Sequence, residues 1–251
     1  MESECETMIT AIIQARMGST RLPGKTMLPF GKGTLLDFIL SRIGKSNYIK
    51  QFVVATTDLP DDDLIVEHCE ENGIPCYRGN TEDVLERFYM AAKQFDATVI
   101  VRITADDPFK TASIIDKAIQ KFLCEELDYC SNTLSPTYPE GLDVEVFSMS
   151  ALRTAYENEI EIYEREHVTP YIWKNKNNRF FIGQITTDVD RSDWRMTIDY
   201  PEDYAALLRL QSYVTEAADY AELVEAVETL SEQRIMSNKT KRNESYNAQN
   251  N

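Results

Sequence analysis

Apolar residues along the chain form short β-rich runs, separated by longer segments with helical periodicity. The β-rich runs carry the branched and aromatic residues typical of buried strands, at 9–14, 52–57, 99–104, 144–147 and 180–185. Between and after them, amphipathic helices are predicted at 34–44, 61–72, 81–95, 110–127, 149–158, 161–174, 201–213 and 218–230. Strands separated by helical crossovers predict an α/β fold with a mainly parallel sheet flanked by helices.

No internal repeat and no long linker rich in Pro, Gly or Ser divides the 251 residues. We therefore expect residues 1–236 to form a single domain with a substantial core. The last residues, 237–251, are polar with almost no apolar side chains. This composition predicts a disordered tail.

The charge balance narrows the classes of partner. Lys and Arg number 26 against 42 Asp and Glu, which gives a net charge of −16 at pH 7. An acidic surface repels phosphate-rich partners, so neither a nucleic acid nor a membrane is expected to bind. No stretch approaches the ~20 apolar residues of a membrane span. Any phosphate that binds this protein must therefore meet a local basic pocket.

The cysteines and the N-terminus bear on the compartment. The five cysteines include no CxxC pair, and with two histidines they do not predict a zinc site. The N-terminal residues begin acidic and lack the basic and continuous apolar regions of a secretory signal. We expect reduced thiols in a cytoplasmic protein.

Residues 12–25, IIQARMGSTRLPGK, run from a buried strand into a basic loop that contains glycines. Ligands of an open α/β sheet bind outside the carboxyl ends of the strands. Glycines there let backbone N–H groups approach an oxyanion, while Arg and Lys supply charge. The loop therefore predicts a phosphate site, with a merely solvated loop as the alternative; its cations and glycines are Arg16, Gly18, Arg21, Gly24 and Lys25.

Two common phosphate-binding motifs do not fit this loop. A Walker A loop reads GxxxxGK[ST], and Ser19 stands where its first glycine would be. A dinucleotide-binding fingerprint, GxGxxG, is also missing after the first strand. The sequence thus argues against an ordinary P-loop NTPase and against a dinucleotide-binding Rossmann domain.

Carboxylates follow two further strand-like runs. Asp106 and Asp107 end the run VRITADDP, and Asp199 ends the run RMTIDYPED before a predicted helix. Mg²⁺ prefers one or two protein carboxylates together with phosphate oxygens and waters. Asp106 and Asp199 are therefore candidate Mg²⁺ ligands, and the alternative is that each only caps the helix that follows it.

Six segments in this order resemble the spore coat polysaccharide biosynthesis protein F family: IIQARMGSTRLPGK, YRGNTEDVLERF, TADDP, PEGLDVEVF, REHVTPYI and TIDYPEDY. That family belongs to the acylneuraminate cytidylyltransferases and is related to the cytidylyltransferases that activate 3-deoxy-manno-octulosonate. The resemblance covers residues 8–214. It is more specific than any single motif because the segments occur together and in order.

The resemblance implies a nucleotide-diphospho-sugar transferase (GT-A-like) fold, with a mainly parallel, Rossmann-like mixed sheet. It further implies a nucleotidyltransferase that moves CMP from CTP to a sugar acid of the nonulosonic or ulosonic type, with release of pyrophosphate. The context implied is polysaccharide biosynthesis. Relatives of this fold are commonly dimers, so a homodimer is expected, with a strand-rich arm at 137–147.

The resemblance also implies roles for single residues. Arg16 and Lys25 would hold the triphosphate, and Asp106 and Asp199 would bind Mg²⁺; these four are the expected catalytic residues. The expected nucleotide site comprises Gln14, Ala15, Arg16, Met17, Gly18, Ser19, Arg21, Lys25, Arg78 and Thr104. The expected sugar site comprises Glu145, Arg165 and His167.

Alternatives remain for two of these assignments. Arg78 either reaches the nucleotide or pairs with a surface carboxylate. His167 either orients or deprotonates the acceptor hydroxyl, or it is a structural histidine of a helix. His68, on the polar segment 61–72, is expected to be solvated.

The sequence departs from the family pattern on both sides of Asp106. Ala105 stands where glycine is usual, and Asp107 stands where a small uncharged residue is usual, which crowds the nucleotide and adds negative charge beside it. These changes keep open a non-catalytic nucleotide-binding protein. A glycosyltransferase on the same fold is the other alternative, although its DxD motif is matched only by 61–63, at a predicted helix start.

Overall fold

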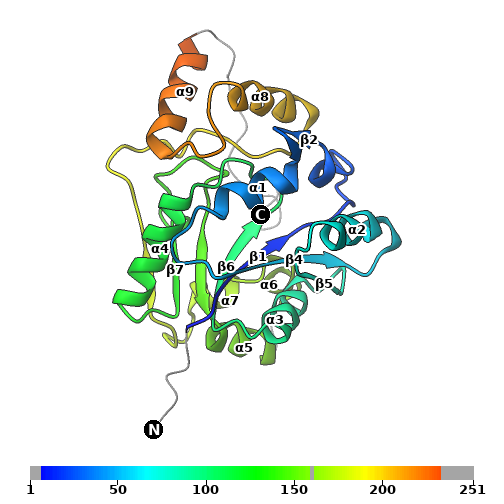
Figure 1. Cartoon of the computed structure of the whole chain (residues 1–251). Helices are drawn as coiled ribbons and strands as arrows, with labels where there is room; N and C mark the ends of the chain where they lie inside the picture. The colour runs from blue at the N-terminus through cyan, green and yellow to red at the C-terminus, as the bar shows by residue number, and fades with distance from the viewer. Residues whose placement is uncertain (1–6, 159–160, 233–251) are drawn as a thin grey trace.

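A mixed β-sheet runs through the centre of the molecule in the computed structural model, which describes residues 7–158 and 161–232 (Figure 1). Its strand order is β5-β4-β1-β6-β8-β7-β9. The strands are β1 (Ile9–Gln14), β4 (Gln51–Thr57), β5 (Cys76–Gly79), β6 (Val99–Thr104), β7 (Tyr129–Ser131), β8 (Glu145–Ser148) and β9 (Ile182–Gln184). The first four in spatial order are parallel, whereas β8 runs antiparallel to both neighbours, so the predicted mixed, mainly parallel sheet is confirmed.

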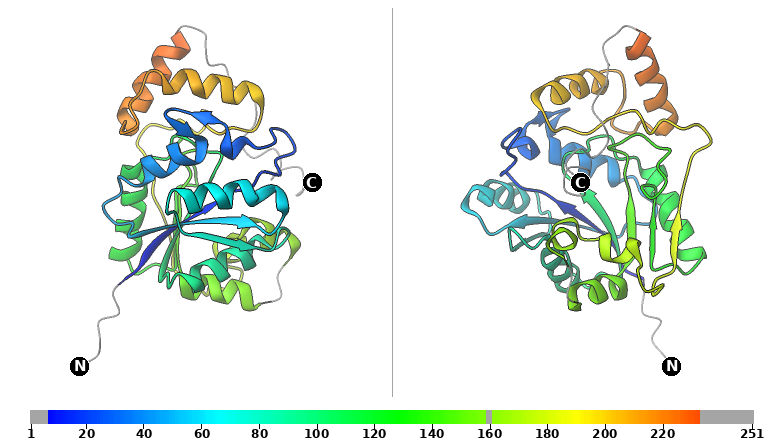
Figure 2. Two further views of the ribbon diagram at one scale, coloured as in Figure 1. Left: turned by 45° about the vertical axis from the view of Figure 1, so that its right-hand side comes forward. Right: turned by 180° about the vertical axis from the view of Figure 1, so that it is seen from behind.

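Helices cover both faces of this sheet (Figure 2). One hydrophobic core lies under α1 (Leu35–Ile43), α2 (Asp63–Glu71), α4 (Ala112–Cys124), α8 (Pro201–Gln211) and α9 (Tyr220–Glu232). The other lies under α3 (Val84–Gln94), α5 (Met149–Glu157) and α7 (Pro170–Lys174), with α6 (Ile162–His167) packed on α3. Successive residues of a strand face opposite sides, so in β1 Ala11 and Ile13 enter the first core while Ile12 enters the second.

Several short elements were not predicted from the sequence. The strands β5 and β7 have four and three residues, too few to show a period. A small hairpin of β2 (Pro29–Phe30) and β3 (Gly33–Thr34) precedes α1. The prediction of one helix over 161–174 was wrong: Val168 has a positive φ of 70°, and Pro170 starts a new helix, so the segment splits into α6 and α7.

Three further expectations concern the C-terminal tail, the segment 137–147 and helices that could cross a membrane. The expected disordered tail, 237–251, lies outside the described residues. The segment 137–147, expected to form an arm, packs into the core of its own chain, where Tyr138, Leu142 and Val144 are buried. Among the described residues, none of the helices combines the length and apolar character that crossing a membrane requires.

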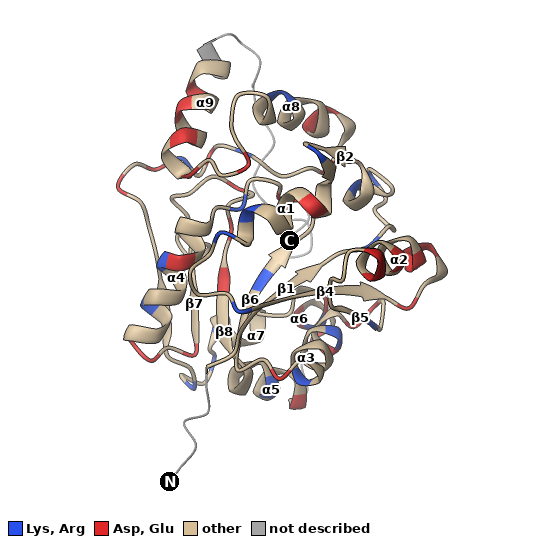
Figure 3. Ribbon diagram, viewed as in Figure 1, with Lys and Arg blue, Asp and Glu red and all other residues tan. Residues whose placement is uncertain are grey.

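Acidic side chains account for the negative net charge mainly on the outside of the molecule. Figure 3 shows Asp and Glu gathered on the outer helices α2 and α9. Buried cations instead occur inside, among them Arg42, Arg87, Lys110 and Arg195. Buried carboxylates accompany them, so the buried charges of the described residues balance; these carboxylates are Asp62, Asp107, Glu145 and Glu164.

Candidate active site

The loops that follow β1 and β6 leave the sheet side by side. Gln14, the last residue of β1, lies in register with Thr104, the last residue of β6. The Ala105 N–H then donates to the Gln14 carbonyl at 3.0 Å. Because parallel strands end at the same edge, this pairing brings the glycine-containing loop next to the loop that carries Asp106, as the sequence predicted.

The loop after β1 is folded around the backbone of Met17. The N–H groups of Ser19 and Gly24 donate to the Met17 carbonyl at 2.8 and 2.9 Å. Gly24 has a φ of 71°, in the left-handed region that favours glycine, and it starts the short helix Lys25–Met27. The Met17 N–H donates to Asp62 at 2.6 Å. Asp62 is buried, so it fixes the loop from the side of β4.

Lys25 joins two carboxylates that come from distant parts of the chain. Its Nζ lies 2.9 Å from Asp106 Oδ2 and 3.3 Å from Asp199 Oδ1, and it donates to the Ile198 carbonyl at 2.6 Å. Burial alone would lower the pKa of Lys25, but the two carboxylates outweigh it and raise the pKa above its usual value. Burial would raise the pKa of Asp106, and Lys25 instead holds it below its usual range. Lys25 and Asp106 are therefore both charged at neutral pH.

Two arginines complete the charge cluster around Asp199. Arg21 lies 2.7 Å from Asp199 Oδ1, and Arg195 lies 2.6 Å from Asp199 Oδ2. Arg195 also holds Asp203 at 2.7 Å. Asp203 in turn accepts hydrogen bonds from the backbone N–H groups of Asp199 and Tyr200. Asp199 is thus positioned by a network that the sequence did not predict, since Arg195 showed no motif of its own.

Arg16 is exposed, as Arg21 is, but it differs from these cations in its contacts. Within the part of the chain that the structure describes, its guanidinium makes no hydrogen bond or ion pair. The loop therefore presents one cation without a protein partner beside a cluster whose charges are already matched.

A polar cavity of about 240 Å³ lies at these loops, bounded by Gln14, Arg16, Ser19, Thr20, Arg21, Lys25, Thr26, Thr104, Ala105, Asp106 and Asp199. A larger cavity of about 700 Å³ adjoins it and shares Arg21, Thr104, Asp106 and Asp199. We call the first the nucleotide end and the second the acceptor end. Six of the ten predicted nucleotide residues line the nucleotide end: Gln14, Arg16, Ser19, Arg21, Lys25 and Thr104. The other four do not: Ala15, Met17, Gly18 and Arg78.

Glu145 is buried at the acceptor end, and both of its carboxylate oxygens accept hydrogen bonds from neighbouring side chains. Its Oε2 accepts from Arg102 at 2.6 Å, and its Oε1 accepts from the hydroxyls of Tyr129 and Thr169 at 2.7 and 2.5 Å. Burial would raise the pKa of Glu145, but Arg102 and these hydroxyls hold it below its usual range. The ionised Glu145 therefore holds Arg102 in place. Arg102 also donates to the Gln14 side chain at 3.3 Å.

Asp107 does not add the free negative charge that its sequence position suggested. It is buried, its Oδ2 lies 2.9 Å from Lys110 Nζ, and it accepts from the Thr104 hydroxyl at 2.8 Å. Lys110 is itself buried and reaches the Asp143 carbonyl. The unusual carboxylate is thus matched by its own cation, and Ala105 is buried beside it.

The remaining predicted site residues divide into two groups. His167 lines the acceptor end, half-buried, with its ring 4.5 Å from that of Tyr163. Arg78 instead pairs with Asp63 at 2.5 Å, and Arg165 pairs with Asp83 at 2.5 Å; neither lines the two cavities. The structure therefore favours the paired alternative for Arg78.

His68 is not solvated as expected. Its Nε2 lies 2.7 Å from Asp37 Oδ1, and its side chain is 17% exposed. The two histidines of the chain thus have different surroundings, because His68 has a carboxylate partner and His167 faces a cavity.

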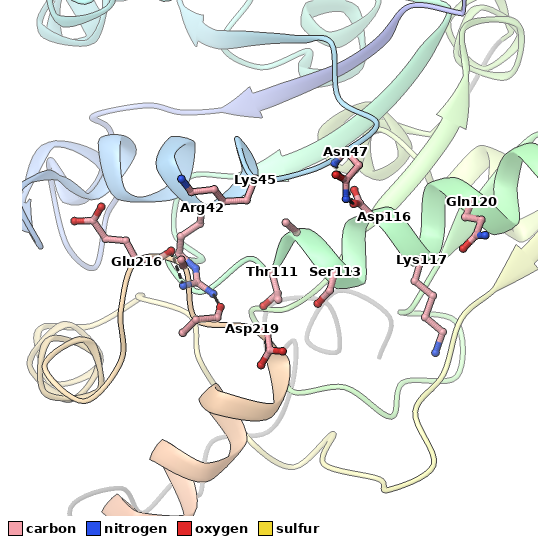
Figure 4. Close-up of a pocket in the computed structure, with 13 residues that line it drawn as sticks. Arg42, Lys45, Asn47, Thr111, Ser113, Asp116, Lys117, Gln120, Glu216 and Asp219 are labelled. Carbon is pink, nitrogen blue, oxygen red and sulfur yellow. Dashed lines mark hydrogen bonds between the residues drawn. The ribbon is translucent and has the colours of Figure 1, made fainter.

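A separate cavity of about 450 Å³ lies between α1, α4 and the start of α9 (Figure 4). Its charged lining residues are balanced: Arg42, Lys45 and Lys117 against Asp116, Glu216 and Asp219. Arg42 is buried and donates to backbone carbonyls of the loops before α4 and α9, at 2.9 Å to Ala218 and 3.0 Å to Lys110. This arrangement ties loops together and gives no convergent chemistry.

Asp106 and Asp199 suit a divalent cation. They come from different loops, converge on one point, and already share a cation there, the Lys25 ammonium. Carboxylate oxygens are the protein ligands that Mg²⁺ prefers. The residues present therefore fit a metal that is held jointly with phosphate oxygens.

Comparison with known proteins gives this site a family. A model of the cytidylyltransferase family matches residues 10–241. The chain belongs to the cytidylyltransferase family. It is therefore a nucleotidyltransferase, as the sequence resemblance predicted, and the match spans both ends of the cavity. The spore coat polysaccharide biosynthesis protein SpsF of Bacillus subtilis is 32% identical over 221 residues, which cover 84% of this chain and 89% of that protein.

Solved structures agree with the fold. A cytidylyltransferase from Leptospira borgpetersenii matches with a TM-score of 0.86 and 35% identity, covering 93% of this chain and 98% of that one. A CMP:2-keto-3-deoxy-manno-octonic acid synthetase complexed with CTP matches with a TM-score of 0.63 and 14% identity, covering 82% and 98%. This confirms the predicted nucleotidyltransferase fold with its Rossmann-like sheet.

Proposed function

We propose that this cytidylyltransferase transfers CMP from CTP to the hydroxyl of a sugar acid and releases pyrophosphate. The observation that carries the proposal is the continuous cavity, in which cations and paired carboxylates at the nucleotide end adjoin a polar acceptor end. The similarity to a synthetase solved with CTP supports CTP as donor and a sugar acid as acceptor. The similarity to SpsF supports a place in polysaccharide biosynthesis.

The nucleotide end would bind the triphosphate. Arg16, without a protein partner, would contact the phosphates, and backbone N–H groups of the loop would approach them closely. The N–H groups of Met17 and Ser19 are committed to Asp62 and to the Met17 carbonyl, so the donors would come from Gly18, Thr20 and Arg21 instead. Gln14, Ala15 and Thr104 at the strand ends would contact the nucleoside.

Asp106 and Asp199 would hold Mg²⁺. When bound, the metal would supply positive charge to the α-phosphate and the departing pyrophosphate. Lys25, released from one or both carboxylates, would contribute its ammonium to the same oxygens. In-line attack of a hydroxyl on phosphorus needs this neutralisation and correct positioning more than a covalent catalyst. Arg16 and Lys25 are therefore proposed as the principal catalytic cations.

The acceptor end would hold the sugar. Arg102, fixed by Glu145 and Gln14, presents a rigid cationic wall between the two ends. His167 lines the same space from α6. Arg165 is paired with Asp83, so its proposed role is to fix α6 to the start of α3 rather than to contact sugar.

Pyrophosphate release tests this function. Purified protein with Mg²⁺ would be offered CTP, UTP, ATP or GTP together with each of a panel of nonulosonic and ulosonic acids. We expect release with CTP and at least one acid, and loss of release in Asp106→Ala. Binding of CTP by calorimetry without release for any acid would overturn the transferase and favour a non-catalytic nucleotide binder.

We further propose a single domain that assembles as a homodimer, as for many relatives of this fold. Since 137–147 packs in its own chain, the dimer contact would lie elsewhere. Light scattering at assay concentration tests this, and a monomer mass would refute it.

A further inference from the structure

A strained turn separates α6 from α7 at the acceptor end. Val168 has a φ of 70° and a ψ of −57°, and the Thr169 N–H donates to the His167 carbonyl at 2.8 Å. These values describe a γ-turn of the rare form with positive φ. A β-branched residue in this region is a genuine outlier. Such strain persists only where the surroundings impose it, and it occurs preferentially at functional sites.

Three contacts impose the turn. The Val168 side chain is buried in the core under α3, α5 and α7. The Thr169 hydroxyl donates to Glu145 Oε1 at 2.5 Å, which ties the turn to β8. Pro170 follows at once and starts α7. The position of His167, just before the turn, is therefore set by the core and by the Glu145 network.

The imidazole of His167 is held facing the acceptor end, in the same cavity as Asp106 and Asp199. Its ring packs against Tyr163, with 4.5 Å between ring centroids. Neither ring nitrogen has a hydrogen-bond partner among residues 7–158 and 161–232. The Nε2 of His68, in contrast, is used by Asp37 at 2.7 Å. His167 thus lacks the carboxylate partner that the structural histidine of this chain has.

The charged groups around His167 keep it neutral at pH 7. Burial is the largest effect and lowers its pKa, and Arg102 on β6 lowers it as well. Glu166 on α6 and Glu145 on β8 act in the opposite direction and raise it. The sum is a pKa below the ordinary value of about 6.5. A neutral imidazole with an unpartnered nitrogen in a polar cavity can accept a proton.

We propose that His167 is the general base of the reaction and that the turn at Val168 is the device that positions it. The inference rests on the proposed function. As the acceptor hydroxyl oxygen forms a bond to the α-phosphorus of CTP, the bond from that phosphorus to the bridging oxygen of pyrophosphate breaks. The hydroxyl proton passes to a ring nitrogen of His167, and the imidazolium later loses it to water.

Kinetics as a function of pH tests the base. For the wild type we expect kcat/KM for the acceptor to rise with pH through a pKa below about 6.5 and then to level off. In His167→Gln this acidic limb should vanish and kcat should fall by about 10²–10⁴-fold, with the KM for CTP little changed. Added imidazole should partly restore His167→Ala. His68→Gln is the matched control, and its profile should equal that of the wild type.

A second pair of variants tests the positioning role. Val168→Gly frees the turn, so we expect kcat to fall by about tenfold while the acidic limb persists, because His167 is present but less well placed. Asn178→Gly is its matched control: Asn178 also has a positive φ, 48°, but it is exposed and lines neither end of the cavity. Its kinetics should not change. Equal kcat in Val168→Gly and wild type would refute the positioning role.

The outcomes separate the inference from the proposed function. If the wild type releases no pyrophosphate with any acceptor, the function fails and the mechanism with it. If the wild type is active and His167→Gln keeps both kcat and the acidic limb, the base assignment alone fails. Proton NMR titration of the two histidine rings gives an answer without turnover: titration of His167 at or above about 6.5 overturns the neutral base.

Discussion

The two ends of the cavity treat charge in opposite ways. At the nucleotide end, Arg16 is exposed and has no protein partner among the described residues, and Lys25 is shared between carboxylates of two loops. At the acceptor end, Arg102 is held by the buried Glu145, which two hydroxyls also fix. Arg16 is thus open to a new partner, whereas Arg102 and Glu145 already bind each other.

On the proposed function, this difference follows from what each end would bind. Triphosphate and metal bring charges of their own, so the groups that receive them must be able to exchange partners. A sugar brings mostly hydroxyls, so the wall that orients it works best when its own donors and acceptors are fixed beforehand. Substitutions at the nucleotide end should therefore alter rate, and those of the Arg102–Glu145 pair should alter stability first.

The largest effect at the nucleotide end is expected for Asp106→Asn. Loss of a metal ligand should remove several kcal/mol of transition-state stabilisation, which lowers kcat by about 10³-fold. The melting temperature should change little, because Lys25 keeps its bonds to Asp199 and to the Ile198 carbonyl. Pyrophosphate release and a thermal melt measure the two quantities. A variant within tenfold of wild-type activity would show that Asp106 is no ligand.

Glu145→Gln should be the most damaging change to stability at the acceptor end. It leaves Arg102 buried without a carboxylate, which should cost about 3 kcal/mol of unfolding free energy. Denaturant unfolding at pH 7 measures the loss, and a double-mutant cycle with Arg102→Gln isolates the pair. A loss below about 0.5 kcal/mol would mean that the ion pair behaves like an exposed one.

The pH dependence of this loss has a definite sign. Burial would raise the pKa of Glu145, but Arg102 and the hydroxyls hold it below its usual range. Its contribution is therefore fully present above the unfolded value of about 4.3 and is lost as the pH falls through the folded pKa. The difference between wild type and Glu145→Gln should shrink in acid and persist at neutral pH.

Arg16→Met sharpens the comparison from the nucleotide end. Removing one cation that meets the phosphates should lower kcat/KM for CTP by about 10²-fold. Stability should not change, because the side chain is exposed and has no partner to lose within the described chain. A large drop in melting temperature would contradict the view that the Arg16 side chain is free to bind a ligand.

The sequence predicted the nucleotide end better than the acceptor end, and the reason is local. The long strand β1 has a clear pattern, and a basic loop at the end of such a strand lies at the ligand-binding edge. Arg102 lies within an apolar run and was not singled out. Its role follows from its bond to Glu145, its register partner in β8, which is 43 residues away in the chain. Such pairing depends on sheet register, which a single sequence does not display.

The helical prediction over 161–174 failed for a related reason. Its residue types favour a helix, and only Pro170 marks a break. The positive φ of Val168 is imposed by tertiary contacts that oppose the preference of a β-branched residue. Local preference therefore gave the right element type and the wrong connection, at the place where His167 enters the cavity.

The smallest effect is expected outside both ends, for Asp37→Asn. Asp37 caps α1 by accepting from the Thr34 N–H at 2.8 Å, and it pairs with His68. The change should cost about 1 kcal/mol of unfolding free energy at neutral pH. Burial opposes the ionised form, but the bonds from Thr34 and His68 hold the pKa of Asp37 below its usual value, so the cost should fade as the pH drops through that pKa.

Kinetic constants complete this last prediction. Asp37 lines neither end of the cavity, so kcat and the KM for CTP should match the wild type at a temperature well below unfolding. A change in kcat of more than a few-fold would show that α1 is coupled to the loop that holds Lys25, which α1 contacts through the short helix Lys25–Met27. The contrast between the nucleotide end, where substitutions change rate, and the Arg102–Glu145 pair, where they change stability, would then have to include α1.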